Sequence, residues 1–212
     1  MTTRLALYNE ALLLLGERPI ANLSENREPR RVLDAIWDGG LVRSVLEQGL
    51  WNFAIRTAQA DYSASVEPSF GYRRAFDKPT DWVRTAGVAG DGYFNSPLTQ
   101  YVDEASYWFA DLDALFVRYV SDDAAYGGDL SAWPQSVVRY AAAHMAHDAC
   151  ERVTQSSTKA ETLRKMADKR LLAARSRDAM NEPTAFPPVG GSWTAARASW
   201  GRRRDWGTGG PF

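Results

Sequence analysis

The sequence predicts an α+β protein: a helical bundle formed by the N- and C-terminal helices, an inserted antiparallel β-domain and an extended C-terminal tail. Three observations predict this. The first 50 residues and the segment after Pro134 follow the 3.6-residue period of helices, the segment between them has short runs of period two, and the last 32 residues hold six Gly and four Pro. We expect N-terminal helices of the bundle in 1–50, the β insert in 51–125, C-terminal helices in 126–180 and a partner-docking tail in 181–212.

Two helices are expected in the first 50 residues. Residues 3–16 carry a wide apolar arc, which indicates burial on more than one side, and end at Gly16, a residue that suits the position after a helix. A second helix is expected from Pro29 to about residue 49. The pair Gly39-Gly40 in its middle costs about 1 kcal/mol per glycine relative to Ala, so either the helix breaks there or a neighbouring backbone passes close. The core residues expected from these stripes are Leu12, Leu15 and Trp37.

The period changes at Trp51. Trp51 and Phe53 are poor partners on one helix face but share a face of a strand, so we expect a strand to begin here and both rings to be core residues. A turn at 78–81 and glycines near residue 90 separate further short segments. The later strands are expected at 72–76, 82–84, 101–103 and 115–120. This spacing of short strands indicates an antiparallel sheet or a small sandwich.

Two helices are expected after Trp133-Pro134. Residues 137–153 form a broad apolar arc whose small Ala positions permit close packing of another helix. Residues 158–179 carry many charges, and Thr158 with Glu161 is a capping-box candidate. The charges indicate a solvated face with i, i+4 ion pairs.

Composition argues against several classes of protein. The chain has 212 residues and a net charge of −1, so no global field attracts nucleic acid or a membrane. No apolar run approaches the ~18 residues needed to cross a bilayer, and we expect no membrane contact. Cys150 is the single cysteine, which excludes an internal disulfide framework and fits a reducing compartment.

A metal site is the most specific chemical function that the sequence could indicate. His144, His147, Asp148 and Glu151 have the spacing of one helix face, but zinc or iron sites of this kind need further ligands, usually from another helix. We favour a polar helix flank or a subunit contact. No nucleophile elbow, Cys/His pair or phosphate-binding glycine loop stands out, so we expect no metal, no cofactor and no enzymatic activity.

Five segments follow one another along the chain: ALYNEAL at 6–12 followed by Leu15-Gly16, LWNFA at 50–54, KPTDWVR at 78–84, FVRYV at 116–120 and the helix start Trp133-Pro134. In their order and spacing these segments resemble the head-to-tail adaptor (connector) family of tailed bacteriophages, of the tail tubular protein A type. The resemblance covers roughly residues 4–175. Lys78 departs from the pattern, because the family usually has an apolar residue before this proline. Neither the Gly39-Gly40 pair nor the tail maps onto the pattern.

The resemblance implies a structural virion protein without catalysis. Such adaptors form a dodecameric ring between portal and tail and continue the DNA channel. The implied partners are further copies of the chain, the portal protein, a tail or stopper protein, and genomic DNA that passes without sequence-specific binding. The implied location is the neck of the virion, after assembly in the host cytoplasm. The helical bundle then meets neighbouring subunits and the portal, while the β insert lies outward or toward the tail. In such a ring, one charged face of the helix at 158–179 would line the channel, although a solvated face is the simpler interpretation.

The tail interleaves aromatic and arginine side chains. Trp and Arg dominate protein-interface hot spots, but aromatics alternating with Arg also stack bases and neutralise phosphates. A nucleic-acid-binding module that uses this tail is therefore the alternative function. The net charge of the tail is only +2, which favours docking to a protein, with the portal as the expected partner. The expected docking residues are Trp193, Arg197, Trp200, Arg202, Arg203, Arg204, Trp206 and Phe212.

Overall fold

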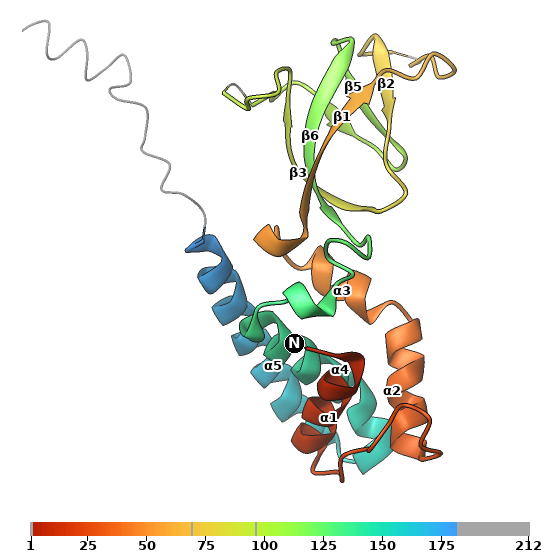
Figure 1. The fold of residues 1–212 in the computed structure, drawn as a ribbon, viewed down its shortest axis with the longest axis vertical. Coiled ribbons are helices and arrows are strands. Elements are labelled where there is room, and N and C mark those ends of the chain that lie inside the picture. Colours follow the sequence, from red (N-terminus) through yellow and green to blue (C-terminus); the bar gives the residue numbers. More distant parts are fainter. Residues whose placement is uncertain (1, 69, 96, 182–212) are drawn as a thin grey trace, which may run out of the picture. The chain divides into compact units, whose positions relative to one another are not determined.

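The computed structural model describes residues 2–68, 70–95 and 97–181. In this part of the chain the protein is a mixed α+β fold with five α-helices and two small antiparallel sheets (Figure 1). The helices are α1 (Arg4–Leu15), α2 (Glu28–Asp38), α3 (Leu41–Glu47), α4 (Gln135–Thr154) and α5 (Ser157–Ala179), with short 3-10 helices η1 (Asn52–Ala54) and η2 (Leu130–Ala132). The strands are β1 (Ile55–Asp61), β2 (Arg74–Asp77), β3 (Trp82–Ala89), β4 (Val102–Asp103), β5 (Tyr107–Ala110) and β6 (Ala114–Ser121).

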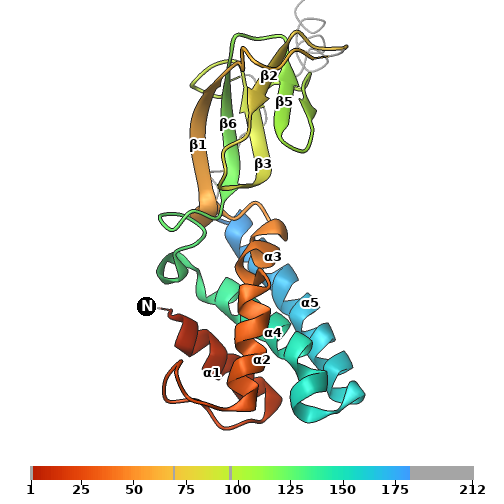
Figure 2. The ribbon, with the colours of Figure 1, turned by 90° about the vertical axis from the view of Figure 1, so that its right-hand side faces the viewer.

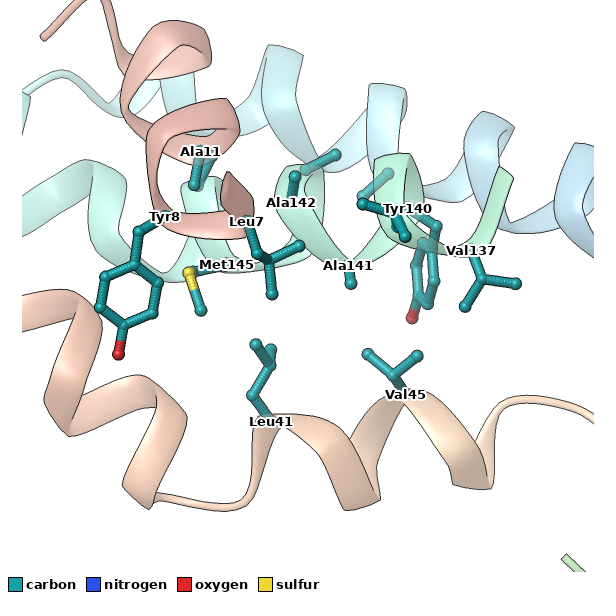
Figure 3. Close-up of a cluster of buried hydrophobic side chains, with 14 of the residues drawn as sticks. Leu7, Tyr8, Ala11, Leu41, Val45, Val137, Tyr140, Ala141, Ala142 and Met145 are labelled. Atoms are coloured by element: carbon teal, nitrogen blue, oxygen red, sulfur yellow. The ribbon is translucent and has the colours of Figure 1, made fainter. Parts of the chain in front are cut away.

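Helix α4 is the centre of the helical part. It contacts α1, α2 and α3 from the first 50 residues and α5 from the C-terminal side (Figure 2). The close-up in Figure 3 shows side chains of α1, α3 and α4 pointing into one space, among them Leu7, Leu41, Val45, Ala141 and Met145. Ala residues on α4 let neighbouring backbones come close, which is why the longest helices share an extended contact.

The expected helix over 3–16 is present as α1. The hydroxyl of Thr3 accepts a hydrogen bond from the N–H of Ala6 at 3.2 Å and caps the first turn. Gly16, at φ 73°, ends the helix in the left-handed conformation. The Gly39-Gly40 pair breaks the second expected helix into α2 and α3, and Gly40 takes a φ of 96°, a conformation that glycine adopts without steric cost.

The six strands form two three-stranded sheets. In the first sheet the order is β1-β6-β3, with Thr57 opposite Arg118 on β6 and Val88 opposite Val117. In the second sheet the order is β2-β5-β4, with Phe76 opposite Trp108. A second core joins the sheets, with buried residues Phe76, Val88, Trp108, Ala110, Leu115, Val117 and Tyr119.

The prediction of a strand beginning at Trp51 is wrong. Residues 52–54 form the 3-10 helix η1, and β1 begins at Ile55. The reason is a tertiary contact: the indole N–H of Trp51 donates to the Val45 carbonyl at 2.9 Å, which folds the chain back onto α3. Trp51 and Phe53 still meet, as stacked rings with centroids 6.2 Å apart rather than as neighbours on a strand.

Two further details differ from the prediction. Ser156, not Thr158, caps α5, because its hydroxyl accepts from the Lys159 N–H at 3.3 Å and the helix begins at Ser157. Strand β5 was not predicted. It alternates half-buried Tyr107 and Phe109 with buried Trp108 and Ala110, so both faces are apolar and the period-two signal is lost.

Candidate assembly surfaces

The predicted docking residues all lie outside the described residues; they are Trp193, Arg197, Trp200, Arg202, Arg203, Arg204, Trp206 and Phe212. Among the predicted core residues, Leu12, Leu15 and Trp51 are buried. Trp37 and Phe53 are half-buried and pack against the same core. The described residues form three candidate surfaces near the helices: the joint between helices and strands, the outer face of α5 and the hollow around the two histidines.

An aromatic row forms the apolar half of the joint, which we define as the contacts of residues 43–54, 81–82, 121–133 and 178. Phe53 lies between Trp51 and Trp133, and its ring centroid is 5.9 Å from that of Trp133. The indole N–H groups of both Trp residues donate to backbone carbonyls, that of Trp133 to Gly127 at 2.8 Å. Each of the two Trp rings is therefore held by ring packing and by a hydrogen bond from its N–H group. These contacts fix the direction in which β1 leaves the helices.

Polar contacts complete the joint. Arg43 of α3 donates to the Asp122 carboxylate at 2.8 Å and to the Trp82 carbonyl at 3.0 Å, so one side chain bridges α3 to the entry of β3 and the exit of β6. Asn52 lies beside the last turn of α5: its N–H donates to the Asp178 carboxylate at 3.1 Å and its amide to the Asp178 carbonyl at 2.9 Å. These bonds connect positions 126 residues apart in sequence.

Asp81 is the electrostatic centre of the joint. Its carboxylate accepts hydrogen bonds from Arg56 at 2.9 Å, Ser121 at 2.5 Å and the Tyr119 hydroxyl at 3.2 Å. Burial alone raises the pKa of Asp81, but the hydrogen bonds from Ser121 and Arg56 outweigh it and hold the pKa below its usual range. Burial, and then the charge of Asp81, raises the pKa of Tyr119 to about 12.

The outer face of α5 is charged in its N-terminal half and exposes large apolar side chains near its C-terminus. The helix carries seven Lys or Arg and three Asp or Glu, a net charge of +4 in a chain whose total is −1. Lys159 donates to the Leu15 carbonyl at 2.5 Å and ties α5 to the end of α1. The N-terminal half of the face has charges of both signs, including a Glu161–Lys165 ion pair at 2.7 Å. Near the C-terminus the face instead exposes Leu172, which is 71% exposed, and Met180 just beyond the helix.

The two histidines line a hollow of about 310 Å³ between α3, α4 and α5. The ring of His144 stacks on Tyr140 and lies 3.8 Å from the Asp148 carboxylate. His147 instead turns Nδ1 toward the Ala160 carbonyl of α5, 3.1 Å away. The two histidines therefore share one helix face, but their rings do not converge on a position where both could bind one metal ion. No group of three or more His, Cys, Asp or Glu in the described ranges is arranged to hold a metal ion.

No protein-family model and no curated protein matches the chain. The resemblance to adaptors therefore rests on its own residues. Those segments have identifiable positions in the fold: 50–54 lies at the joint, 78–84 contains the joint residues Asp81 and Trp82, 116–120 lies in the central strand β6, and Trp133-Pro134 precedes α4. Within the described part of the chain, no helix combines the length and hydrophobicity that crossing a bilayer requires.

Sequence reasoning missed the joint as a site. Asp81 and Trp82 were assigned to a turn and a short strand, and Arg43 was not singled out, because their partners are distant in sequence. The signal available was the concentration of Trp and Asp at segment boundaries, namely Trp51, Asp81, Trp82, Asp122 and Trp133.

Proposed function

We propose that this chain is a structural head-to-tail adaptor of a tailed bacteriophage, and that it has no enzymatic activity. It works by assembly: twelve copies form a ring between portal and tail that continues the DNA channel. In this proposal helices from both ends of the chain form the bundle, the β insert projects from it, and the extended tail binds the portal. The protein is a virion component of the neck, assembled in the host cytoplasm.

One observation carries the proposal. The segments that resemble adaptors include those that build the joint, where Trp51, Phe53 and Trp133 pack together and Arg43 and Asp81 make charge-assisted hydrogen bonds. A joint of this kind holds the insert in one direction relative to the helices. Such a direction is what a ring subunit needs, because a heterologous contact closes only when the rotation between copies is fixed.

The outer face of α5 is the proposed contact between copies. Leu172 and Met180 are more than two-thirds exposed, and a large apolar residue on an otherwise charged helix gains stability when a neighbour covers it. The mixed charges of the N-terminal half would set the register between copies, since opposite charges attract and like charges repel. A portal template would enforce the closing rotation, so the isolated chain is expected to be monomeric.

The tail supplies the proposed attachment to the portal. Trp193, Trp200 and Trp206 would each contribute roughly 1.5–3 kcal/mol on burial, before the cost of ordering the tail is subtracted. The basic surplus of α5 suits an environment close to DNA, but the attraction is sequence-independent and agrees with DNA that passes without being read.

The test is reconstitution with the portal protein encoded in the same genome. Electron microscopy of the mixture should show rings of this chain on the portal, and a variant that ends at Asn181 should attach less. Circular dichroism of the shortened variant controls for folding. If the full-length chain ignores its cognate portal, the adaptor proposal is wrong.

Nucleic-acid binding by the tail is the second candidate, and the Trp–Arg alternation after Trp193 favours it. Under this alternative the chain binds DNA with an affinity that falls steeply with salt. A variant with Arg202, Arg203 and Arg204 changed to Ala should then lose DNA binding. Under the adaptor proposal the same variant changes portal attachment, while binding to DNA is weak from the start.

A further inference from the structure

A groove of about 490 Å³ lies on the β insert, between the loop before β2 and the hairpin of β4 and β5. Four aromatic residues line it: Phe70, Tyr72, Tyr107 and Phe109. The Tyr107 and Phe109 ring centroids are 6.1 Å apart, so the rings form a continuous apolar wall. Phe70 is 91% exposed, the largest exposure among the large apolar side chains of the described residues. Exposed aromatic rings gathered in one groove, rather than scattered singly, indicate a contact surface.

Two carboxylates give the groove its charge. Glu67 and Glu104 line it, both are exposed, and neither forms an ion pair with any residue in the described part of the chain. No lysine or arginine lines the groove to balance them. Lys78 lies nearby, but it donates to the backbone carbonyl of Glu104 and forms its ion pair with Asp103. The groove therefore combines aromatic faces with two carboxylates that have no ion-pair partner in the described ranges, and the ligand that complements both is a cation on an apolar stem.

The β insert itself uses this recognition at neighbouring positions. Arg74 lies over the ring of Tyr62 at 4.0 Å, Arg118 over Phe94 at 4.2 Å and Lys78 over Trp82 at 3.6 Å. Within the described ranges no cation lies over any of the four rings of the groove. The neighbouring rings of the insert are thus covered by cations of the same chain, whereas the rings of the groove remain open to a cation from a ligand.

An open sheet edge borders the groove. In the order β2-β5-β4, strand β4 pairs with β5 and with no other strand of the described residues, and its residue Val102 lines the groove. An edge strand presents backbone N–H and C=O groups to an incoming extended segment. This favours a peptide strand over a free small cation, because the strand satisfies the edge and the groove together.

We propose that this groove binds an extended segment of a partner protein that carries Arg or Lys between apolar residues. The cation stacks on the rings near Phe70 and lies between Glu67 and Glu104, while apolar neighbours cover Val102 and Phe109. This inference goes beyond the proposed adaptor function and does not require it, because binding of one segment needs neither a ring nor a portal.

The probe is a blocked, fluorescein-labelled peptide of sequence Thr-Val-Arg-Val-Arg-Val-Thr, titrated into the full-length protein at low salt. Fluorescence polarisation should show saturable binding that weakens as salt rises. Phe70→Ala should weaken the affinity at least tenfold, and the double variant E67Q/E104Q should do the same. Tyr93→Ala is the matched control: Tyr93 is 85% exposed on another loop of the insert, and its loss should change the affinity less than twofold.

Peptide variants separate the chemical causes. Replacing both arginines of the probe with citrulline keeps the shape and removes the charge, and should weaken binding at least tenfold. Equal binding of the citrulline peptide would overturn the cationic part of the proposal. Failure of the arginine peptide to bind, or binding unchanged by both Phe70→Ala and E67Q/E104Q, would overturn the site. Binding of an oligosaccharide in place of the peptide would overturn the choice of ligand.

Thermal unfolding of each variant shows whether lost binding reflects lost structure. Phe70, Glu67 and Glu104 are exposed, so the unfolding midpoints should match that of the wild type. Ring formation on the portal is measured separately. A Phe70→Ala chain that still forms rings but loses the peptide leaves the adaptor proposal intact, and a chain that binds the peptide but ignores the portal contradicts only the adaptor proposal.

Discussion

Asp81 shows how much a single residue decides at the joint. The sequence predicts that Asp81 lies in a turn between two strands, where an aspartate normally faces water. In the fold its carboxylate collects hydrogen bonds from Arg56, Tyr119 and Ser121, three donors that lie 25 to 40 residues away. No local pattern encodes such a cluster, because the strands that bring the donors together are themselves placed by tertiary packing.

The cluster makes stability depend on pH. Because the pKa of Asp81 is lowered in the folded state, its contribution is complete above the usual aspartate value, near 4, and is lost as the pH falls through the folded pKa. At pH 7, Asp81→Asn should lower the free energy of unfolding by about 1–3 kcal/mol. The difference between the two proteins should shrink below about pH 4.

Urea unfolding at pH 7 and at pH 3 measures this prediction. Asp77→Asn is the control, because Asp77 is exposed on β2 and loses the same charge. A difference between wild type and Asp81→Asn that stays constant from pH 7 to pH 3 would contradict the role assigned to the carboxylate.

Gly127 is the second residue on which the joint depends. A Cβ at this position would clash with the Ser121 carbonyl and lie 2.7 Å from the side chain of Leu46. Gly127→Ala should therefore lower the free energy of unfolding by about 1–3 kcal/mol. Gly87→Ala is the matched control, since a Cβ there meets only the Phe94 ring at 3.9 Å and should be tolerated. Chemical denaturation compares the two, and equal stability would show that the joint is not tightly packed around Gly127.

At the scale of elements, prediction followed the strength of the periodic signal. Helices α1 and α4 were anticipated within a few residues because each carries a long, broad apolar arc. The signal failed where tertiary contacts override it. Trp51 is bound to the Val45 carbonyl and starts a 3-10 helix, and β5 is apolar on both faces because it lies over one core and under an aromatic groove.

The outer face of α5 yields the prediction that belongs to this scale. Leu172→Glu should leave the free energy of unfolding within about 0.5 kcal/mol of the wild type, because the side chain is exposed. In the proposed ring it should abolish or strongly reduce assembly, since a charge would be buried between copies. Leu13→Glu is the control on α1, where a leucine of 75% exposure lies away from the proposed contact. Counting rings by negative-stain microscopy decides; equal ring numbers for both variants would move the interface elsewhere.

At the scale of the whole molecule, the sequence was sufficient for the mixed α+β class and for strands placed between two helical regions. It was sufficient because Gly, Pro and the change of period mark the boundaries near residues 50 and 134. It placed core aromatic residues at the boundary near Trp51, but it did not anticipate the polar contacts of the joint or the groove. The joint depends on Arg43 reaching Asp122, and the groove on a loop near Phe70 facing the β4–β5 hairpin, and both contacts are products of the folded backbone.

The assembled particle provides the most direct measurement of the central claim. Cryo-electron microscopy of the full-length chain mixed with its cognate portal gives the number of copies and the symmetry of the complex. The adaptor account predicts a ring of twelve copies on the portal, coaxial with its channel. Unoccupied portals in the presence of excess folded chain would contradict it.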